Sequence, residues 1–135
     1  PVPFEAELRH ANTYLDLEKL RFGEQLKIVY HIEVVDFQIP SLSIQPLVEN
    51  AVKHGVGKKS EGGTVTITSR EVEHGYEVTV ADDGKGFDPE KKQDDGRSHV
   101  GIENVRQRLH IMCNGTLTIM SGREAGTVAT IFIPR

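Results

Sequence analysis

The chain has 135 residues, a length that fits one domain with a sizeable core, and its 37% hydrophobic and 27% charged residues are ordinary for a globular protein. Its net charge of -4 gives no general attraction to nucleic acid or to an anionic membrane, and no apolar run resembles a membrane span or a signal peptide. Cys113 is the only cysteine, which excludes a disulfide within the chain and a zinc site of clustered cysteines, so a reducing, cytoplasmic setting is the simplest inference.

The first third of the chain predicts a helix followed by a strand. The sequence opens without an initiator Met, so we expect a piece of a longer protein. Apolar residues at roughly helical spacing over residues 4–22 predict an amphipathic helix that ends at Gly23. Residues 26–35 are rich in β-branched side chains and predict a strand. Ser41 or Ser43 could cap the helix that follows.

Residues 40–56 predict one central helix with two different sides. An apolar stripe with the spacing of a core-facing helix comprises Ile44, Leu47, Val48, Ala51 and Val52. Glu49, Asn50 and Lys53 fall on the opposite side, and His54 lies one turn beyond Asn50. An Asn among Glu, Lys and His suggests ligation of a metal and of phosphate. A plain amphipathic helix remains the alternative from this stretch alone.

The second half of the chain alternates hairpins with one helix. We expect a first hairpin over residues 64–72 and 76–81, a mobile polar loop over 88–99, a helix over 100–113 and a second hairpin over 116–120 and 127–133. Helices followed by antiparallel hairpins predict a two-layer α+β sandwich, with a mixed, mostly antiparallel sheet covered on one face by helices.

Asp82 stands at the end of the strand that closes the first hairpin. The period of two places it on the same side as Val78 and Val80, which should face the core, so Asp82 should point into the mouth of an apolar pocket. A buried carboxylate needs a donor, and the exocyclic amine of a purine is one. Gly84 and Gly86 permit close approach of a ring. The alternative is that these residues form only a turn.

Two further segments could complete such a pocket. Residues 96–102 pass from a polar loop into a helix, whose N-terminus is a ready anion site. Gly101 leaves room there for phosphate oxygens near the N–H groups of the first turn. Gly126 and Thr127 open the last strand, where the Thr127 hydroxyl could reach the same pocket. Alone, that threonine is simply a residue that favours strands.

These four segments occur in the order and approximate spacing of the N, G1, G2 and G3 boxes, and the chain therefore resembles the GHKL ATP-binding superfamily, which has the Bergerat fold and includes gyrase, HSP90, histidine kinases and MutL. Residues 45–55, 100–109 and 14–22 look very like LytS/YehU-type sensor histidine kinases. The resemblance implies that residues 1–23 form a linker helix leading from a missing dimerisation and phosphoacceptor segment. It implies an ATP-binding catalytic domain over residues 24–135.

The resemblance also implies roles for the residues of the motifs. Asn50 would bind Mg²⁺, while Lys53 and His54 would contact the phosphates or the ribose of ATP. Lys53 would also neutralise charge during phosphoryl transfer, and Glu49 would be a carboxylate that assists transfer or holds a magnesium-bound water. At the adenine end, Asp82 would bind the adenine amine, Thr127 would support Asp82, and the adenine pocket would be shaped by Gly84, Gly86 and Phe87. At the phosphate end, residues 88–99 would form the ATP lid, and Gly101 and Ile102 would lie beneath the phosphates.

One position favours a kinase over an ATPase. Resembling hydrolases carry a water-activating Glu four residues before the metal-binding Asn, and here that residue is Pro46, which has no basic side chain. The resemblance implies a catalytic domain that binds Mg-ATP and transfers the γ-phosphoryl group to a histidine outside this chain, in a homodimeric, membrane-anchored parent with a cytoplasmic catalytic domain. A response regulator would be the next acceptor, and no nucleic-acid partner is expected.

Other functions remain compatible with the same motifs. A GHKL protein serine kinase or an anti-sigma-like switch would bind a protein partner in a nucleotide-dependent way. A degenerate nucleotide sensor would bind without catalysis, although Asn50, Asp82 and Gly101 are all present. A scaffold that binds no nucleotide is disfavoured by four motifs in the expected order.

Overall fold

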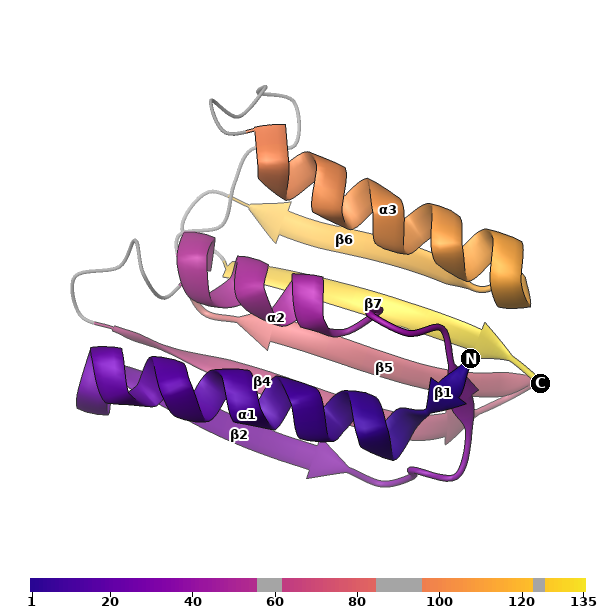
Figure 1. The fold of residues 1–135 in the computed structure, drawn as a ribbon, viewed down its shortest axis with the longest axis horizontal. Helices are drawn as coiled ribbons and strands as arrows, with labels where there is room; N and C mark the ends of the chain where they lie inside the picture. Colours follow the sequence, from indigo (N-terminus) through magenta and orange to yellow (C-terminus); the bar gives the residue numbers. More distant parts are fainter. Residues whose placement is uncertain (56–61, 85–95, 123–125) are drawn as a thin grey trace.

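A computed structural model of the chain describes residues 1–55, 62–84, 96–122 and 126–135. Helices and a sheet form two layers, and all three α-helices lie on one face of the sheet (Figure 1). The helices are α1 (Phe4–Phe22), α2 (Gln45–Asn50) and α3 (Gly96–Cys113), with a short 3-10 turn at Gly23–Gln25 and a π-helical turn at Ala51–Gly55.

The main sheet has five strands in the order β2-β4-β5-β7-β6. These strands are β2 (Leu26–Ile32), β4 (Gly63–Val72), β5 (Gly75–Asp82), β6 (Thr116–Gly122) and β7 (Gly126–Pro134). β2 runs parallel to β4, and every other neighbouring pair is antiparallel. Both predicted hairpins are therefore confirmed, as is the predicted two-layer α+β fold with a mixed, mostly antiparallel sheet. A two-stranded ribbon, β1 (Val2–Pro3) with β3 (Gln38–Ile39), was not predicted.

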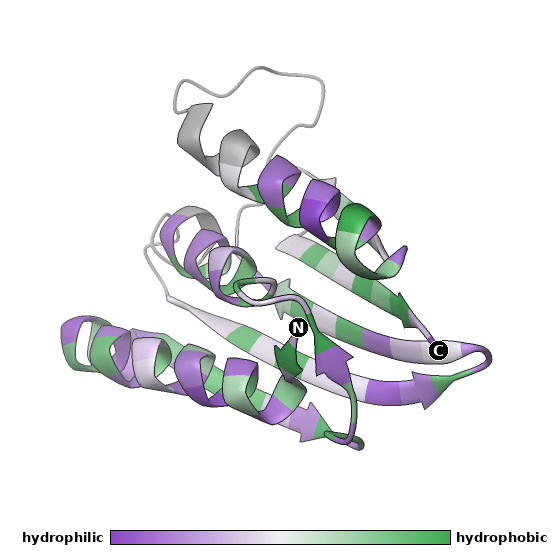
Figure 2. Ribbon diagram, turned by 45° about the vertical axis from the view of Figure 1, so that its right-hand side comes forward, coloured by the Kyte–Doolittle hydropathy of each residue, from purple (hydrophilic) through white to green (hydrophobic). Residues whose placement is uncertain are grey.

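The core lies between the helix layer and the inner face of the sheet. Hydrophobic and hydrophilic residues alternate along α1 and along the strands, as expected for elements with one buried and one exposed side (Figure 2). α1 contributes Phe4, Ala11 and Leu15 to this core, all fully buried. The predicted helix over residues 4–22 is confirmed, and it packs into the same core as the rest of the chain.

The central helix is shorter than predicted. Instead of one helix over residues 40–56, the chain makes a turn over residues 41–44, the α-helix α2, and then the π-helical turn. Leu42 has a φ of 61°, a left-handed conformation that an α-helix does not accommodate. Pro46 lies in the first helical turn, where the missing N–H costs little. The apolar stripe is still buried, with Ile44 and Val48 at 0% exposure.

The predicted serine cap of the central helix is wrong. Among the described residues, neither Ser41 nor Ser43 caps the start of α2; the Ser43 hydroxyl instead donates to the Pro40 carbonyl at 2.6 Å. The cap comes from Glu7 on α1, whose side chain is buried and accepts backbone N–H groups of the turn. A carboxylate at the start of a helix stabilises the unpaired amides found there.

Two other boundaries differ from the sequence-based expectation by three residues or more. β2 ends at Ile32 rather than at residue 35, and α3 begins at Gly96 rather than at residue 100. Neither α1 nor α3, nor any shorter helix in the described ranges, is both long and apolar enough to cross a lipid bilayer.

Candidate nucleotide-binding site

Asp82 ends β5 on its buried side. Val78 is fully buried, Val80 is 3% exposed and Asp82 is 9% exposed, so the predicted alternation toward the core is confirmed. The Asp82 carboxylate accepts the backbone N–H of Gly84 at 2.9 Å, which is also the hydrogen bond of a local turn. The two alternatives drawn from the sequence, a buried carboxylate and a turn, therefore occur together.

Burial raises the pKa of Asp82 to about 6. Hydrogen bonds from the backbone N–H groups of Gly84 and Thr127 lower this pKa, and the nearby Asp83 carboxylate raises it. A carboxylate offers about four acceptor positions, and these two amides occupy only part of that capacity. Asp82 can therefore accept a further donor, while its position in the core excludes much of the competing water.

Thr127 and Gly126 lie directly beside Asp82 on the neighbouring strand. Thr127 is the register partner of Asp82, and its hydroxyl forms a 2.8 Å hydrogen bond with the Ser121 hydroxyl. Gly126 has a φ of 79°, and a Cβ at this position would lie 2.2 Å from the Asp82 carbonyl oxygen. Ser121 could not be predicted as part of the site, because a serine beside a turn carries no signal of its partner.

Asp83 fixes the neighbouring strand. It accepts the Thr64 backbone N–H at 2.7 Å, and its own N–H donates to the Thr64 carbonyl at 3.3 Å. This pair joins the start of β4 to the end of β5. Asp83 thus anchors the backbone that carries Asp82, a role that the local sequence does not reveal because Thr64 is 19 residues away.

The polar side of α2 lies toward the same end of the sheet. The C-terminal end of α2, the Asp82 end of β5 and the N-terminal end of α3 all lie toward the left in Figure 1. The π-helical turn packs on β4, β5 and β7, and its own Val52 is buried at 1% exposure. Glu49 and Asn50 are half-buried and Lys53 is exposed, as the predicted polar side requires.

A tyrosine from α1 lies close to this polar side. The pKa of Tyr14 is raised to about 12, mainly by burial and also by the nearby carboxylates of Glu18 and Glu49. In the described part of the chain, the buried Tyr14 hydroxyl and Glu18 Oε2 have no hydrogen-bond partner. Near them, a cavity of about 170 Å³ is lined by Glu18, Arg21, Phe22, Val52 and Lys53. The Tyr14 phenol therefore stays protonated beside Glu49.

The phosphate-binding segment differs from its prediction. Since α3 begins at Gly96, Gly101 lies in the second helical turn rather than in the first. No described atom lies within 4 Å of a Cβ built on Gly101, so this glycine does not serve internal packing. The Ile102 side chain is in the core at 8% exposure.

Several predicted site residues cannot be placed. Gly86, Phe87 and residues 88–95 of the predicted lid lie outside the described residues, as does the His54 side chain. The described site therefore brings together Asp82, Gly84 and Thr127 at one end of β5. It places Glu49, Asn50 and Lys53 above that end, on the helix layer.

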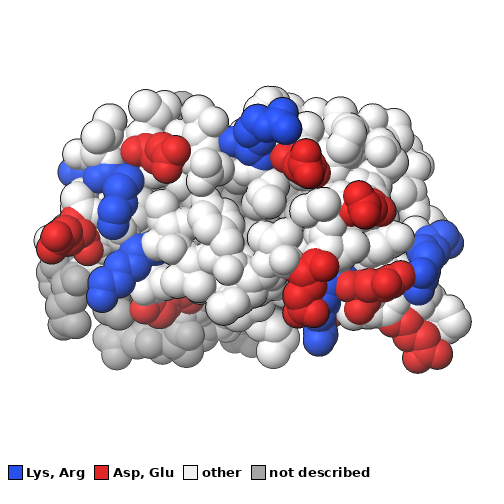
Figure 3. All heavy atoms as spheres, turned by 90° about the horizontal axis from the view of Figure 1, so that it is seen from below, with Lys and Arg blue, Asp and Glu red and all other residues white. Residues whose placement is uncertain are grey.

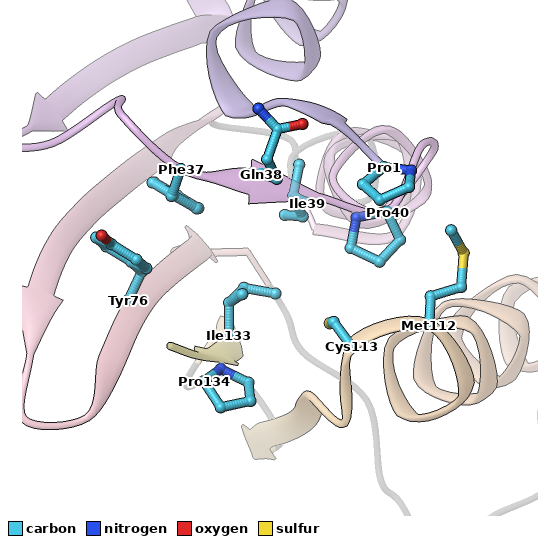
Figure 4. Close-up of a pocket in the computed structure, with 10 residues that line it drawn as sticks. All are labelled: Pro1, Phe37, Gln38, Ile39, Pro40, Tyr76, Met112, Cys113, Ile133 and Pro134. Atoms are coloured by element: carbon cyan, nitrogen blue, oxygen red, sulfur yellow. The ribbon is translucent and has the colours of Figure 1, made fainter.

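A separate cavity lies at the opposite end of the sheet. It measures about 270 Å³, and its lining includes Phe37, Tyr76, Cys113 and Ile133 (Figure 4). The Phe37 ring stacks on Tyr76 with centroids 4.5 Å apart. Tyr76 is the second residue of β5 and Asp82 is the last, which separates the two places by roughly 20 Å of extended chain. This mostly apolar cavity is therefore distinct from the Asp82 site.

The surface seen from below in Figure 3 carries charges of both signs. Lys and Arg side chains are interspersed with Asp and Glu around an uncharged centre, without an extended patch of one sign on this face. Such a face produces little net field at a distance.

Comparison with known proteins identifies the family. The family described as "Histidine kinase-, DNA gyrase B-, and HSP90-like ATPase" matches residues 40–135. Sensor histidine kinase YpdA of Escherichia coli (strain K12) is 34% identical over 139 residues, which cover 98% of this chain and 24% of YpdA. Sensor protein LytS of Bacillus subtilis (strain 168) is 34% identical over 145 residues, with the same two coverages.

The fold agrees with this assignment. The histidine kinase domain of the blue-light activated histidine kinase EL346 from Erythrobacter litoralis superposes with a TM-score of 0.74 at 22% identity, over 98% of this chain and 61% of that domain. The chain spans between about a fifth and about a half of the length of the curated relatives it matches. The chain therefore belongs to the histidine kinase-, DNA gyrase B- and HSP90-like ATPase family, and its similarity to YpdA and LytS extends over nearly its whole length.

Proposed function

We propose that this domain binds Mg-ATP with its adenine at Asp82, and that it transfers the γ-phosphoryl group to a histidine outside the chain. The observation that carries the proposal is the buried Asp82 carboxylate, which keeps acceptor capacity at the end of a core strand. The polar side of α2 and the π-helical turn lies toward the same end. Family membership supports ATP as the ligand.

At the adenine end, Asp82 accepts a hydrogen bond from the exocyclic amine of the base. Gly84 and Gly86, with Phe87, shape the pocket, and Thr127 holds Asp82 from the neighbouring strand. The buried position of Asp82 supports this role, because a hydrogen bond to a charged acceptor is stronger away from water. A base without that amine would leave the carboxylate without this donor.

At the phosphate end, Asn50 holds Mg²⁺ together with the phosphates. The amide oxygen of Asn50 suits a hard cation, and Mg²⁺ is commonly held by few protein ligands plus substrate phosphates. In the described residues no three His, Cys, Asp or Glu side chains form a metal cluster, which fits a metal that arrives with the nucleotide. Bound Mg²⁺ supplies neutralisation of the phosphate charge. Lys53 and His54 contact the phosphates or ribose, and Glu49 assists the transfer or holds a magnesium-bound water.

The acceptor is a histidine rather than water. Pro46 occupies the place where hydrolases of this superfamily carry a water-activating Glu, and its ring cannot take a proton. The relatives named above are about four times as long as this chain, which leaves room for further segments. We place there the phosphoacceptor histidine, the dimerisation segment that leads into the linker helix of residues 1–23, and a membrane anchor that keeps this domain in the cytoplasm. A response regulator is the next acceptor.

Titration of Mg-ATP into the 135-residue chain by calorimetry tests the proposed pocket. We expect Asp82→Asn to weaken binding about 100-fold, because the amide presents an N–H toward the adenine amine and loses the charge. Asp36→Asn, at an exposed aspartate, is the matched control and should bind as the wild type does. Unchanged binding by Asp82→Asn would show that the adenine lies elsewhere.

The same titration, with and without magnesium, tests the metal ligand. We expect Asn50→Ala to remove the magnesium dependence of ATP affinity, because the only proposed protein ligand is lost. Asn104→Ala, on the exposed side of α3, is the matched control. An Asn50→Ala variant that keeps the wild-type magnesium dependence would contradict this assignment.

The glycine proposed beneath the phosphates gives a separate test. Gly101→Ala should stabilise the nucleotide-free domain by about 0.5–1 kcal/mol, because the position is helical and a Cβ meets no described atom within 4 Å. If Gly101 and Ile102 lie beneath the phosphates, the same change should weaken Mg-ATP binding about tenfold by filling that space. Urea unfolding measures the change in stability, and calorimetry measures the change in Mg-ATP affinity. A stabilised Gly101→Ala variant with wild-type affinity would show that Gly101 does not lie beneath the phosphates.

The nature of the acceptor is tested in the longer protein. Labelling with γ-labelled ATP should give a phosphoryl group that is stable in alkali and lost in acid, as expected of phosphohistidine. The opposite lability would indicate a serine kinase.

A further inference from the structure

The turn over residues 41–44 is held from one side by α1. Glu7 is 4% exposed, and its Oε1 accepts the N–H groups of Ser43 at 2.9 Å and Ile44 at 3.3 Å. Its Oε2 accepts the N–H of Leu42 at 3.1 Å. One buried carboxylate thus pairs three consecutive amides, two from the turn before α2 and one from its N-cap residue Ile44.

The same turn is held from the other side by α3. Nη1 of Arg108 donates to the carbonyl oxygens of Ser41 at 2.7 Å and Leu42 at 2.8 Å. The carboxylate from α1 therefore pairs the donors of the turn, and the guanidinium from α3 pairs its acceptors. Both side chains therefore bind the peptide units on either side of Leu42, Glu7 through the N–H groups and Arg108 through the carbonyl oxygens.

The turn needs such support from outside. Leu42 has a left-handed φ of 61° and a side chain that is 52% exposed, so the conformation costs free energy that its own side chain does not recover by burial. α2 is only 6 residues long, too short to be stable by its own hydrogen bonds. Its position must therefore be set by its apolar stripe and by the anchors at its start.

We propose that Glu7 and Arg108 are positioning residues for phosphoryl transfer, which hold the Ser41–Ile44 turn from α1 and α3 and thereby set the position of Asn50 and Lys53. This inference rests on the proposed function of α2. From Ile44 to Asn50 the helix rises only about 9 Å. A displacement of the start of α2 therefore displaces Asn50, the proposed metal ligand, by a similar amount. Metal and phosphate contacts tolerate only displacements well below 1 Å. The geometry of the site is therefore sensitive to Glu7 and Arg108, which hold the start of α2.

The test compares variants of the anchors with matched variants on the same helices. Glu7→Gln keeps one acceptor oxygen but turns an amide N–H toward the N–H of Leu42. Arg108→Met removes both bonds to the turn and keeps a long side chain, whereas the Arg108→Lys ammonium can still donate to both carbonyls. The controls are Glu5→Gln, at an exposed glutamate on α1 paired with Arg9, and Arg106→Met, at an arginine on α3 that donates to Leu117 and Glu103.

The first readout is amide hydrogen exchange without nucleotide, with the β5 amides as the reference for global opening. We expect the amides of residues 48–50, the first that are hydrogen-bonded within the helix, to exchange about tenfold faster relative to β5 in Glu7→Gln and in Arg108→Met. Arg108→Lys should restore most of the protection, and the two controls should match the wild type. Unchanged relative exchange in Glu7→Gln and Arg108→Met would overturn the anchoring role.

The second readout is the Kd of Mg-ATP for the 135-residue chain, measured at a temperature where every variant is folded. We expect about a tenfold weakening in Glu7→Gln and in Arg108→Met, recovery in Arg108→Lys, and a double variant weakened by less than the product of the two single effects, because both act through one turn. Faster exchange of α2 with an unchanged Kd, or an equal loss in Arg106→Met, would overturn the positioning role. Failure of the wild type to bind Mg-ATP would contradict the proposed function, while the exchange readout would still decide whether the two residues anchor α2.

Discussion

Lowering the pH through about 6 is expected to weaken ATP binding and, at the same time, to stabilise the nucleotide-free domain. Both effects follow from the ionisation of Asp82, whose pKa is raised by burial to about 6. The adenine amine is a donor and needs the carboxylate form, so affinity should fall about tenfold per pH unit below 6. The nucleotide-free fold has the opposite preference, because the buried charge is costly.

The sign of the stability effect follows from the two pKa values of Asp82. The folded value of about 6 exceeds the ordinary value of 3.8, so the folded domain binds the proton more tightly than the unfolded chain does. The stabilisation is fully present below about pH 4 and is lost as the pH rises through 6. Above that pH, Asp82→Asn should be more stable than the wild type by about 1–2 kcal/mol, allowing for solvent screening.

Urea unfolding of the wild type and of Asp82→Asn between pH 4.5 and 8 measures this difference. Subtracting the two curves removes the titration of the histidines and the other carboxylates, which both proteins share. For the binding arm, adenosine should be titrated beside Mg-ATP, because phosphate groups titrate near pH 6 and adenosine has none. A stability difference that does not change with pH, or an adenosine affinity that does not fall below pH 6, would contradict the role given to Asp82.

The placement of Asp82 could be predicted because it depends on a local rule. In a strand whose valines face the core, the period of two fixes the side of each residue, and Val78, Val80 and Asp82 follow it. The two hairpins and the α+β sandwich were predictable for the same reason, since alternation and turn residues are adjacent in the sequence. The order of the four motifs then suggested the family that the comparisons show.

The start of α2 could not be predicted, because its cap is remote in sequence. Glu7 precedes the amides that it accepts by 35 to 37 residues, and only the packing of α1 against α2 brings them together. Ser41 and Ser43 carried the usual local signal of a cap, and the tertiary contact replaced it. The π-helical turn was equally hidden, since it keeps Ala51 and Val52 buried as an α-helix would.

The start of α3 shows the limit of helix propensity. Gly96 and Ser98 are poor helix formers, so the sequence favoured a loop up to residue 99, and yet the helix begins at Gly96. The pairing of Ser121 with Thr127 was also unpredictable, because it needs the register of β6 against β7. Local patterns thus predicted which residues face the core, and tertiary contacts determined how the site is held.

Replacing Gly126 by Ala is expected to destabilise the domain by about 4 kcal/mol or more, a large part of the stability of a small domain. Two costs combine at this position. The φ of 79° strains any residue with a Cβ by about 1–3 kcal/mol. The new Cβ would also lie 2.2 Å from the Asp82 carbonyl oxygen and 3.1 Å from the Asp83 Cα, so the β5 backbone must move.

Gly23→Ala separates these two costs. Gly23 has a φ of 60°, but no described atom lies within 4 Å of its Cβ position, so this variant carries the backbone strain without the overlap. In urea unfolding, the free energy of unfolding of Gly126→Ala should be lower than that of Gly23→Ala by at least about 2 kcal/mol. Equal losses would show that β5 and β7 can separate freely at this end. Because Asp82 pairs with Thr127 across the same two strands, such freedom would also contradict a rigid Asp82 site.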